Sequence, residues 1–333
     1  MQKILVAGPA WVGDMVMAQS LYKTLRQRYP DVVIDVLAPA WSGPILKRMP
    51  EVRRHIEMPL GHGALGLKQR YRLGKSLRAE RYDQAIITPR SFKSALTPYF
   101  AQIPLRTGYK GELRYGLIND MRPLDKMVLT QTVQRYVALG LERDAALPPE
   151  IIYPSLTVDA ENQQRLLQSL NLSLQQPVVG FMPAAEYGPS KRWPPEYFAQ
   201  LAQQLVVQGR QVWLFGSAKD KPLCDEIAAA AGVGVTNLAG RTQLEDAVDL
   251  IALTDLVVSN DSGLMHIAAA TGGRIIALYG SSSPDYTPPL TDNATVLYLR
   301  LECSPCFERE CPLGHYRCLK EISPQKVFEI CQQ

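Results

Sequence analysis

Short glycine-containing loops that follow apolar runs carry the residues most able to do chemistry. The stretch "GPAWVGDMV", residues 8–16, has the glycine spacing of a phosphate-binding loop, but Asp14 and Met15 stand where such a loop needs Lys and then Ser or Thr. A carboxylate there would repel a triphosphate, which disfavours an NTPase, and the glycine pattern of a dinucleotide-binding loop is absent. Asp14 at a predicted helix start is typical of an N-cap or of a general base, and this stretch alone favours the cap.

Three loops in the second half of the sequence contain groups that suit a phosphorylated ligand. The first, within residues 181–198, places Lys191 just before a helix that begins with proline. The second, residues 214–220, contains a Gly-Ser pair where the backbone can approach a nucleotide. The third, "SNDSGLMH" at residues 259–266, places backbone N–H groups at a helix start, where the helix dipole also favours an anion. Together these loops predict a binding site for a diphosphate.

Alternating strand-like and helix-like segments predict an α/β fold with mostly parallel sheets. A chain of 333 residues exceeds what one hydrophobic core usually serves, and a Pro-rich linker at residues 142–158 divides it. We therefore expect two Rossmann-like, doubly wound domains facing each other across a cleft, with ligands at the carboxyl ends of the strands. The expected strands are 3–7, 32–37, 83–88, 177–182, 211–215, 255–259 and 274–278, and the expected helices are 14–28, 67–81, 90–101, 159–170, 195–208, 219–230, 243–253 and 262–271.

The positive charges are unevenly distributed along the chain. The net charge is +4, yet residues 47–81 alone contain ten Lys or Arg and three acidic residues. Such a run is usually a solvated surface, and the alternative is a surface that meets phosphorylated lipid or membrane headgroups. No nucleic-acid motif accompanies it, so nucleic acid is not an expected partner. Residues 1–8 are too short an apolar run for a signal peptide, and no stretch suits a membrane span, so we expect a cytoplasmic protein.

Several segments spread over nearly the whole chain are similar, in order, to segments of one known family. They are "GPAWVGDMVMAQSLYKTLRQRYP", "SFKSAL", "RTGYKGELRYGLIND", "KRWP", "LFGSAKD", "NLAGRTQL", "NDSGLMHIAAA" and "ALYGSSSPDYTPPL". The chain resembles the ADP-heptose:lipopolysaccharide heptosyltransferases of glycosyltransferase family 9, most of all their heptosyltransferase II branch. The resemblance implies a GT-B fold in which residues 1–150 bind the acceptor and residues 158–320 bind the ADP-heptose donor. It also implies a C-terminal helix at 321–333 that could cross back to the first domain.

The resemblance implies an enzyme that adds a sugar to lipopolysaccharide. The reaction would be an inverting transfer of L-glycero-D-manno-heptose from ADP-L-glycero-β-D-manno-heptose to heptosyl-Kdo2-lipid A, adding the second heptose of the inner core. The enzyme would act peripherally on the cytoplasmic face of the inner membrane, with the basic segment 47–81 against its surface, and would require no cofactor. A first- or third-heptose transferase, or another GT-B nucleotide-sugar enzyme such as an epimerase, is the alternative.

The resemblance also implies roles for single residues. Asp14 would be the general base on the acceptor hydroxyl, and Lys191 would stabilise the departing ADP. Asp261 would bind the donor heptose. His266 would line the diphosphate, although a histidine satisfied by a nearby carbonyl is an equally good interpretation. The other residues assigned to the donor are Gly13, Ala184, Ser217, Lys219, Ser262, Gly263 and Leu264, and those assigned to the acceptor are Arg90, Lys93, Arg106 and Arg114.

Four cysteines, Cys303, Cys306, Cys311 and Cys318, follow one another in the spacing C-x2-C-x4-C-x6-C. This is compact enough for a structural zinc ion or an iron–sulfur cluster, but it matches neither familiar pattern. A reduced or partly disulfide-bonded loop is the favoured interpretation, since disulfides are uncommon in the cytoplasm. Functions of other classes that we considered are an iron–sulfur redox module, resting on these cysteines, and a two-lobed solute-binding protein, resting on the paired α/β layout.

Overall fold

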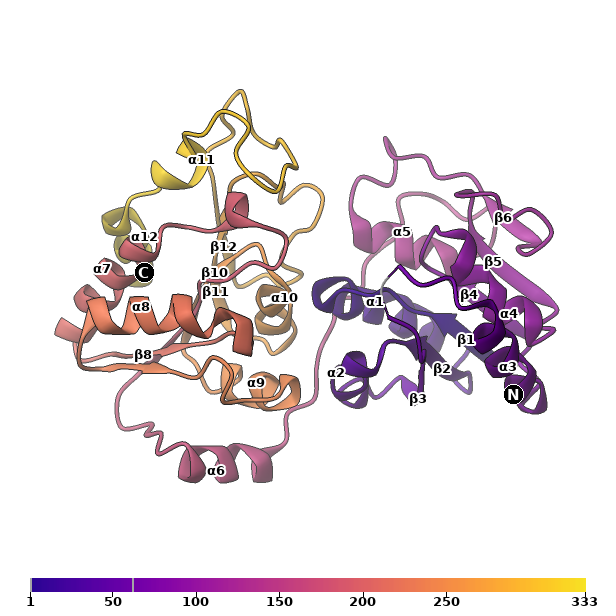
Figure 1. Ribbon diagram of the computed structural model, residues 1–333, viewed down its shortest axis with the longest axis horizontal. Coiled ribbons are helices and arrows are strands. Elements are labelled where there is room, and N and C mark those ends of the chain that lie inside the picture. The colour runs from indigo at the N-terminus through magenta and orange to yellow at the C-terminus, as the bar shows by residue number, and fades with distance from the viewer. Residues whose placement is uncertain (1, 62) are drawn as a thin grey trace. The chain divides into compact units, whose positions relative to one another are not determined.

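The computed structural model describes residues 2–61 and 63–333 and divides the chain into two compact units, Met1–Pro154 and Ser155–Gln333 (Figure 1). Met1 and His62 lie outside the described residues, so the predicted first domain and the basic segment 47–81 are each described without one residue. The division between the units falls inside the Pro-rich stretch at residues 142–158.

The first unit is built on six parallel strands in the order β3-β2-β1-β4-β5-β6, which is the strand order of a Rossmann fold. The strands are β1 (Lys3–Ala7), β2 (Val33–Ala38), β3 (Val52–Glu57), β4 (Gln84–Ile87), β5 (Leu105–Tyr109) and β6 (Asp120–Arg122). The helices are α1 (Val12–Arg28), α2 (Gly43–Lys47), α3 (Leu67–Leu77), α4 (Leu96–Phe100) and α5 (Thr132–Leu139), with 3-10 turns η1 (Ala40–Ser42), η2 (Arg78–Glu80) and η3 (Phe92–Ala95).

The second unit repeats this plan with six more parallel strands in the order β12-β11-β10-β7-β8-β9. The strands are β7 (Val178–Met182), β8 (Gln211–Leu214), β9 (Val235–Asn237), β10 (Leu256–Asn260), β11 (Arg274–Tyr279) and β12 (Ala294–Tyr298). The helices are α6 (Ala160–Ser169), α7 (Pro195–Val207), α8 (Lys221–Ala231), α9 (Leu244–Ile251), α10 (Gly263–Ala270), α11 (Arg317–Lys320) and α12 (Pro324–Cys331), with 3-10 turns η4 (Pro189–Lys191) and η5 (Ala218–Asp220). The predicted α/β fold with two doubly wound sheets is confirmed.

The central strands are apolar because helices cover both faces of each sheet. Every residue of β7 and of β10 is buried, as expected for the middle of a parallel sheet. Figure 1 shows α7, α8 and α12 in the second unit, where α7 contacts both α8 and α12, whereas α9 contacts α6 and α10. These rigid central strands hold the loops at their carboxyl ends in place.

The sequence pattern did not predict several strands that carry charged residues or are very short. Strand β3 has the sequence VRRHIE, and its two arginines bind the fully buried carboxylate of Asp35 on β2, so ion pairs replace an apolar pattern there. The expected helix at 90–101 was partly wrong, because the segment forms the 3-10 turn η3 followed by the short helix α4.

The C-terminal helix packs against elements of the second unit, and its expected return to the first domain stays a prediction. Helix α12 contacts α7 and β11 of its own unit, and Val327 and Cys331 are buried in the second hydrophobic core. The Trp193 indole Nε1–H donates to the Ile322 carbonyl over 2.8 Å, which anchors the approach to α12. Among the described residues, none of the helices has the length and apolar character needed to cross a bilayer.

Candidate active site

Each sheet has one position where the chain reverses its direction of winding, and the polar loops predicted from the sequence lie there. In the first unit this position is between β1 and β4, and in the second it is between β7 and β10. Ligands of doubly wound folds bind outside the carboxyl ends of the strands at such positions. The sequence following these four strands supplies Asp14, Arg90, Lys191 and Asp261 respectively.

Asp14 lies in the first turn of α1 and is held by a tyrosine from α5. The N-cap of the helix is Trp11, so the cap position favoured by the sequence is not the position of Asp14. The Asp14 carboxylate oxygen Oδ1 accepts a hydrogen bond of 3.0 Å from the Tyr136 hydroxyl, and its side chain is only partly buried. Helix α5 packs along α1, which fixes the phenol relative to the carboxylate. The arrangement suits a base that must keep one orientation while remaining accessible to a ligand.

The loop that carries Lys191 is fastened at both ends by one buried asparagine. Asn260, the last residue of β10, donates from its side-chain amide to the Pro183 carbonyl over 2.7 Å and accepts from the Trp193 backbone N–H over 3.0 Å. Both partners flank the loop between β7 and α7. Because β7 and β10 are neighbours in the sheet, this amide connects the two strand ends that form the site.

Lys191 and Asp261 form a close, largely buried ion pair. The Lys191 Nζ lies 2.6 Å from Asp261 Oδ2, and the two side chains are 18% and 5% exposed. The Tyr187 ring stacks under the same ammonium, with 5.0 Å between Nζ and the ring centroid. A partly buried ammonium held by a carboxylate and an aromatic face has a defined position, yet enough exposure to meet an anion.

Helix α10 begins directly after Asp261 and directs its first backbone N–H groups to the same loop cluster. Its N-cap is Ser262, whose hydroxyl accepts from the Met265 N–H, while Gly263 and Leu264 are only partly buried. Two first-turn N–H groups and the positive end of the helix dipole therefore lie near Lys191. This combination is typical of a phosphate-binding position.

His266, on the next turn of α10, is a neutral imidazole at physiological pH. Burial is the largest influence and lowers the pKa of His266 to about 4, while the Asp261 carboxylate raises the pKa and the Lys191 ammonium lowers it. A neutral imidazole donates from one ring nitrogen and accepts at the other. It can therefore orient an oxygen of a ligand without adding charge, and the predicted role beside a diphosphate stays a prediction.

Three other residues assigned to the donor have side chains that are less well placed to bind a ligand. The Ser217 hydroxyl donates to Asp220 over 2.7 Å in a capping box at η5, so its oxygen serves the turn. Lys219 is 80% exposed and only 3.4 Å from Glu186. Ala184 is partly buried and offers only backbone groups. Gly13 is buried on α1 of the first unit, directly before Asp14 in the sequence, and its assignment to the donor stays a prediction.

The four basic residues assigned to the acceptor divide into exposed and structural ones. Arg90 is exposed and Lys93 partly exposed on the loop after β4. Arg106 donates to the Leu117 carbonyl over 2.7 Å and to further backbone carbonyls, so it ties its loop together. Arg114 is fully buried and donates to the carbonyls of Pro89 and Tyr109, and burial lowers its pKa to about 10. Its guanidinium is enclosed beneath the loop and holds that loop in place, so the assignment of Arg114 to the acceptor stays a prediction without direct support from its position.

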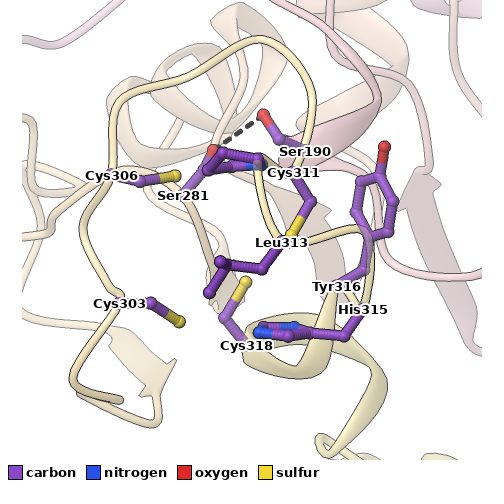
Figure 2. A pocket seen from close by; sticks show the side chains of 10 residues that line it. Ser190, Ser281, Cys303, Cys306, Cys311, Leu313, His315, Tyr316 and Cys318 are labelled. Carbon is purple, nitrogen blue, oxygen red and sulfur yellow. Dashed lines mark hydrogen bonds between the residues drawn. The ribbon is translucent and has the colours of Figure 1, made fainter.

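Four cysteines surround one small cavity, shown in Figure 2. Burial and then the other three thiols raise the pKa of Cys318 to about 11. Burial also acts to raise the pKa of Cys311, but backbone N–H groups of residues 313–316 donate to its sulfur and bring the pKa below its usual value. Within residues 2–61 and 63–333, no group of three or more His, Cys, Asp or Glu side chains is arranged so that it could hold a metal ion.

Sequence reasoning missed three residues of the two sites. Tyr136 and Asn260 hold their partners across long sequence separations, which no local pattern reveals. Ser282, on the loop after β11, is 3% exposed, and its hydroxyl oxygen has no hydrogen-bond partner among the described residues. The only sequence signal for it was the Gly-Ser-Ser-Ser run at residues 280–283.

Comparisons with known proteins point to one family and together cover nearly the whole chain. The family model for glycosyltransferase family 9 (heptosyltransferase) matches residues 70–317. Lipopolysaccharide heptosyltransferase 2 of Salmonella typhimurium is 51% identical, with 98% of this chain and 97% of that protein covered. Lipooligosaccharide heptosyltransferase 2 of Haemophilus influenzae is 50% identical, with the same coverage. The solved structure of E. coli ADP-heptose lps heptosyltransferase II matches with a TM-score of 0.89 and 46% identity, covering 100% of this chain and 98% of that one.

Proposed function

Because the chain belongs to glycosyltransferase family 9, the heptosyltransferases, we propose that it transfers a heptose from ADP-heptose to the inner core of lipopolysaccharide as the second heptose. The observation that carries this assignment is the sequence identity of 51% and 50% to relatives named heptosyltransferase 2, which extends over nearly the full chain. The donor is ADP-L-glycero-β-D-manno-heptose, and the acceptor is heptosyl-Kdo2-lipid A.

Asp14 acts as the general base of the reaction. The acceptor hydroxyl oxygen attacks the anomeric carbon of the donor heptose, and the carboxylate takes the hydroxyl proton as the new glycosidic bond forms. The Tyr136 hydroxyl donates to one carboxylate oxygen and so fixes the orientation of the base. Attack from the side opposite the leaving group inverts the configuration at the anomeric carbon.

Lys191 stabilises the leaving group. As the bond between the anomeric carbon and the diphosphate oxygen breaks, its electron pair stays on ADP, and the developing charge lies beside the Lys191 ammonium and the first N–H groups of α10. Asp261 holds the ammonium through Oδ2 and offers Oδ1 to a hydroxyl of the donor heptose. His266, as a neutral donor, and the Ser282 hydroxyl complete the polar lining of the diphosphate. Fixed charge of this kind substitutes for a metal ion.

The exposed part of the basic segment contacts the membrane surface. Lys68, Arg72 and Lys75 are exposed on α3, and the apolar side chains Leu67 and Tyr71 are about half exposed beside them. Cations next to exposed apolar and aromatic groups are typical of helices that lie against anionic lipid headgroups. Other cations of the segment serve the fold: Arg70 donates to the Leu65 carbonyl, and the two arginines of β3 bind Asp35 and Glu80.

A product mass tests the reaction and the order of transfer together. The purified protein is incubated with ADP-heptose and either Kdo2-lipid A or heptosyl-Kdo2-lipid A, and the lipid products are weighed by mass spectrometry. We expect one heptose to be added to the second acceptor and none to the first. Transfer to Kdo2-lipid A alone would make the protein a first-heptose transferase, and no transfer to either acceptor would contradict the proposal.

A further inference from the structure

A second cation, Arg309, shares an aromatic ring with the ammonium of Lys191. The Lys191 Nζ lies 5.0 Å from the centroid of the Tyr187 ring, and the guanidinium carbon of Arg309 lies 5.5 Å from the same centroid. Arg309 comes from the long loop between β12 and α11, far from Lys191 in the sequence. One aromatic ring therefore brings two cations from different loops to the same part of the second unit.

The backbone that carries Arg309 is hydrogen-bonded to the loop that carries Lys191. The Ser190 N–H donates to the Arg309 carbonyl over 3.1 Å, and the Ser190 hydroxyl donates to the carbonyl of the residue before Arg309. The Tyr187 hydroxyl donates to the next carbonyl back along the chain. Three consecutive carbonyls, those of residues 307–309, thus accept from two residues of the other loop. These bonds fix the backbone of Arg309 relative to the backbone that precedes Lys191.

The contact between the two loops is too close for a side chain at position 188. A Cβ atom there would overlap the Arg309 carbonyl oxygen, so Gly188 lets the backbones approach. The same segment is also bonded to the loop after β11. The Phe307 N–H donates to the Ser281 carbonyl over 2.7 Å, and the Ser281 hydroxyl lies 3.0 Å from the Ser190 hydroxyl (Figure 2). The backbone next to Arg309 is therefore held by two loops at once.

The charges already assigned to the second unit's site nearly cancel. Lys191 is paired with Asp261 at 2.6 Å, and the His266 imidazole is neutral because burial lowers its pKa to about 4. The departing nucleotide carries more than one negative charge, because each of its phosphates is ionised. The positive end of the α10 dipole supplies only a partial charge. A further cation would therefore stabilise a nucleoside diphosphate as it leaves.

Arg309 has a charge that no carboxylate of the protein neutralises. In the part of the chain that the structure describes, its guanidinium forms no ion pair, although Glu308 and Glu310 flank it in the sequence. Its side chain is exposed, so a ligand can reach it. By contrast, Lys219 has a carboxylate partner at 3.4 Å, and Arg192 donates to a carbonyl of its own loop. A guanidinium held by an aromatic face still presents the forked N–H donors that fit a phosphate.

We propose that Arg309 binds the diphosphate of the donor together with Lys191, as a second cation held by Tyr187. This inference rests on the proposed function, because it concerns the same leaving group. When the bond between the anomeric carbon and the diphosphate oxygen breaks, its electron pair stays on ADP, and the two cations share the resulting negative charge. The guanidinium donates charge-assisted hydrogen bonds to phosphate oxygens and keeps its protons. Tyr187 is a positioning residue, since it contacts the cations rather than the nucleotide.

Nucleotide binding tests the role of Arg309 without any assay of transfer. The affinities of the full chain for ADP and for AMP are measured by calorimetry at low salt, in the wild-type protein and in Arg309→Gln. Loss of a charge-assisted hydrogen bond should weaken ADP binding by about ten- to a hundredfold. AMP carries less negative charge, so its binding should weaken much less. A changed ratio of the two affinities is a result that general loosening of the loop would not give.

Arg300→Gln is the matched control for the loss of an exposed arginine. Its guanidinium carbon also lies over a tyrosine, 5.2 Å from the Tyr298 ring centroid, but its charge is paired with Asp285. This variant should keep both affinities. Arg309→Lys keeps the charge without the planar fork and should retain part of the ADP affinity. Tyr187→Phe keeps the ring and should affect ADP binding less than Tyr187→Leu, which removes it.

Three outcomes would overturn the proposal. These are unchanged ADP affinity in Arg309→Gln, equal loss of ADP and AMP affinity in that variant, and an equal loss of ADP affinity in Arg300→Gln. If urea unfolding shows that Arg309→Gln does not fold, the same ratio measured for Arg309→Lys and Tyr187→Leu decides the question. Wild-type protein that binds no ADP would contradict the proposed function. Wild-type protein that binds ADP as tightly as Arg309→Gln does would contradict the role of Arg309 alone.

Discussion

The two units share one strand order, but the loops that follow their two central strands carry opposite charges. The segment after β1, the first strand of the first unit along the chain, has the carboxylate of Asp14. The loop after β7, the first strand of the second unit along the chain, has the ammonium of Lys191. The loop after the fourth strand along the chain has the cation Arg90 in the first unit, after β4, and the carboxylate of Asp261 in the second unit, after β10. The same scaffold therefore presents a base in one unit and a cation in the other, as deprotonating an acceptor and releasing a diphosphate would require.

The partners of the two carboxylates differ in charge, and this sets their chemistry. Asp14 accepts from the neutral Tyr136 hydroxyl, whereas Asp261 is paired with the Lys191 ammonium at 2.6 Å. The hydroxyl that bonds to Asp14 is a neutral donor, whereas a proton on Asp261 would break the ion pair with Lys191. We infer that Asp14 is the carboxylate adapted to exchange a proton and that Asp261 is the one adapted to hold a cation.

Replacing Asp14 gives the largest expected effect and tests one side of this comparison. Asp14→Asn keeps the shape and the bond from Tyr136 but cannot take a proton, so kcat should fall by about a thousandfold, within the range for loss of a general base. The affinity for ADP-heptose, measured by calorimetry, should change little. The exposed Asp31→Asn is the matched control and should keep wild-type kcat. An Asp14→Asn variant with more than a tenth of wild-type turnover would show that another group takes the proton.

Replacing Lys191 tests the role of the cation in the second unit. Lys191→Met should lower kcat by about a hundredfold, as is typical when one fixed group on a developing charge is removed. It also leaves Asp261 buried without its cation, which lowers the free energy of unfolding. The double variant Lys191→Met/Asp261→Asn should regain stability but not kcat, which separates the two effects in urea unfolding and steady-state assays. Lys221→Met, which breaks an exposed ion pair, is the control. Recovery of kcat in the double variant would refute the role of Lys191.

The sequence was informative where the relevant contacts are local. Strands β1, β7 and β10 were predicted because buried central strands form apolar runs, and the loops after them were predicted from glycine and charge. Tyr136 lies 122 residues from Asp14, and Asn260 lies 67 residues from Trp193, so only the folded chain brings them together. The burial of Arg114 was not predicted, because a charge pattern does not reveal that a guanidinium is enclosed and bound to carbonyls.

The buried His266 makes the second unit's site the more acid-sensitive of the two. Its pKa is lowered to about 4 in the folded protein, while an unfolded histidine titrates near 6.5. The unfolded chain therefore binds the proton first, and this residue costs stability as pH falls from about 6.5 towards 4. Relative to His266→Gln, the wild-type protein should lose up to about 3 kcal/mol of unfolding free energy over that range. Urea unfolding at several pH values measures this, and parallel pH profiles would contradict a buried neutral imidazole.

Removing the Tyr136 hydroxyl should weaken the first unit's site only modestly. Tyr136→Phe deletes one hydrogen bond to Asp14, whose net contribution of about 1 kcal/mol corresponds to a loss of several-fold in kcat. The pH at which kcat falls on the acid side should also move, since the bond stabilises the ionised carboxylate. Tyr153→Phe, at an exposed tyrosine, is the control. A fall in stability with an unmoved pH profile would leave Tyr136 only a structural role.

The smallest effects should come from the exposed cations of α3, which act on the acceptor only through the membrane that carries it. Each of Lys68→Ala, Arg72→Ala and Lys75→Ala removes roughly 1 kcal/mol of attraction to an anionic lipid surface, about fivefold in vesicle binding. The KM for acceptor presented in vesicles should rise with it, and the KM for ADP-heptose should not. Salt should diminish the difference, because these charges are exposed. Arg241→Ala, an exposed cation of the second unit, should leave vesicle binding unchanged. Equal losses from α3 and from Arg241 would mean that net charge, not this helix, attracts the enzyme to lipid.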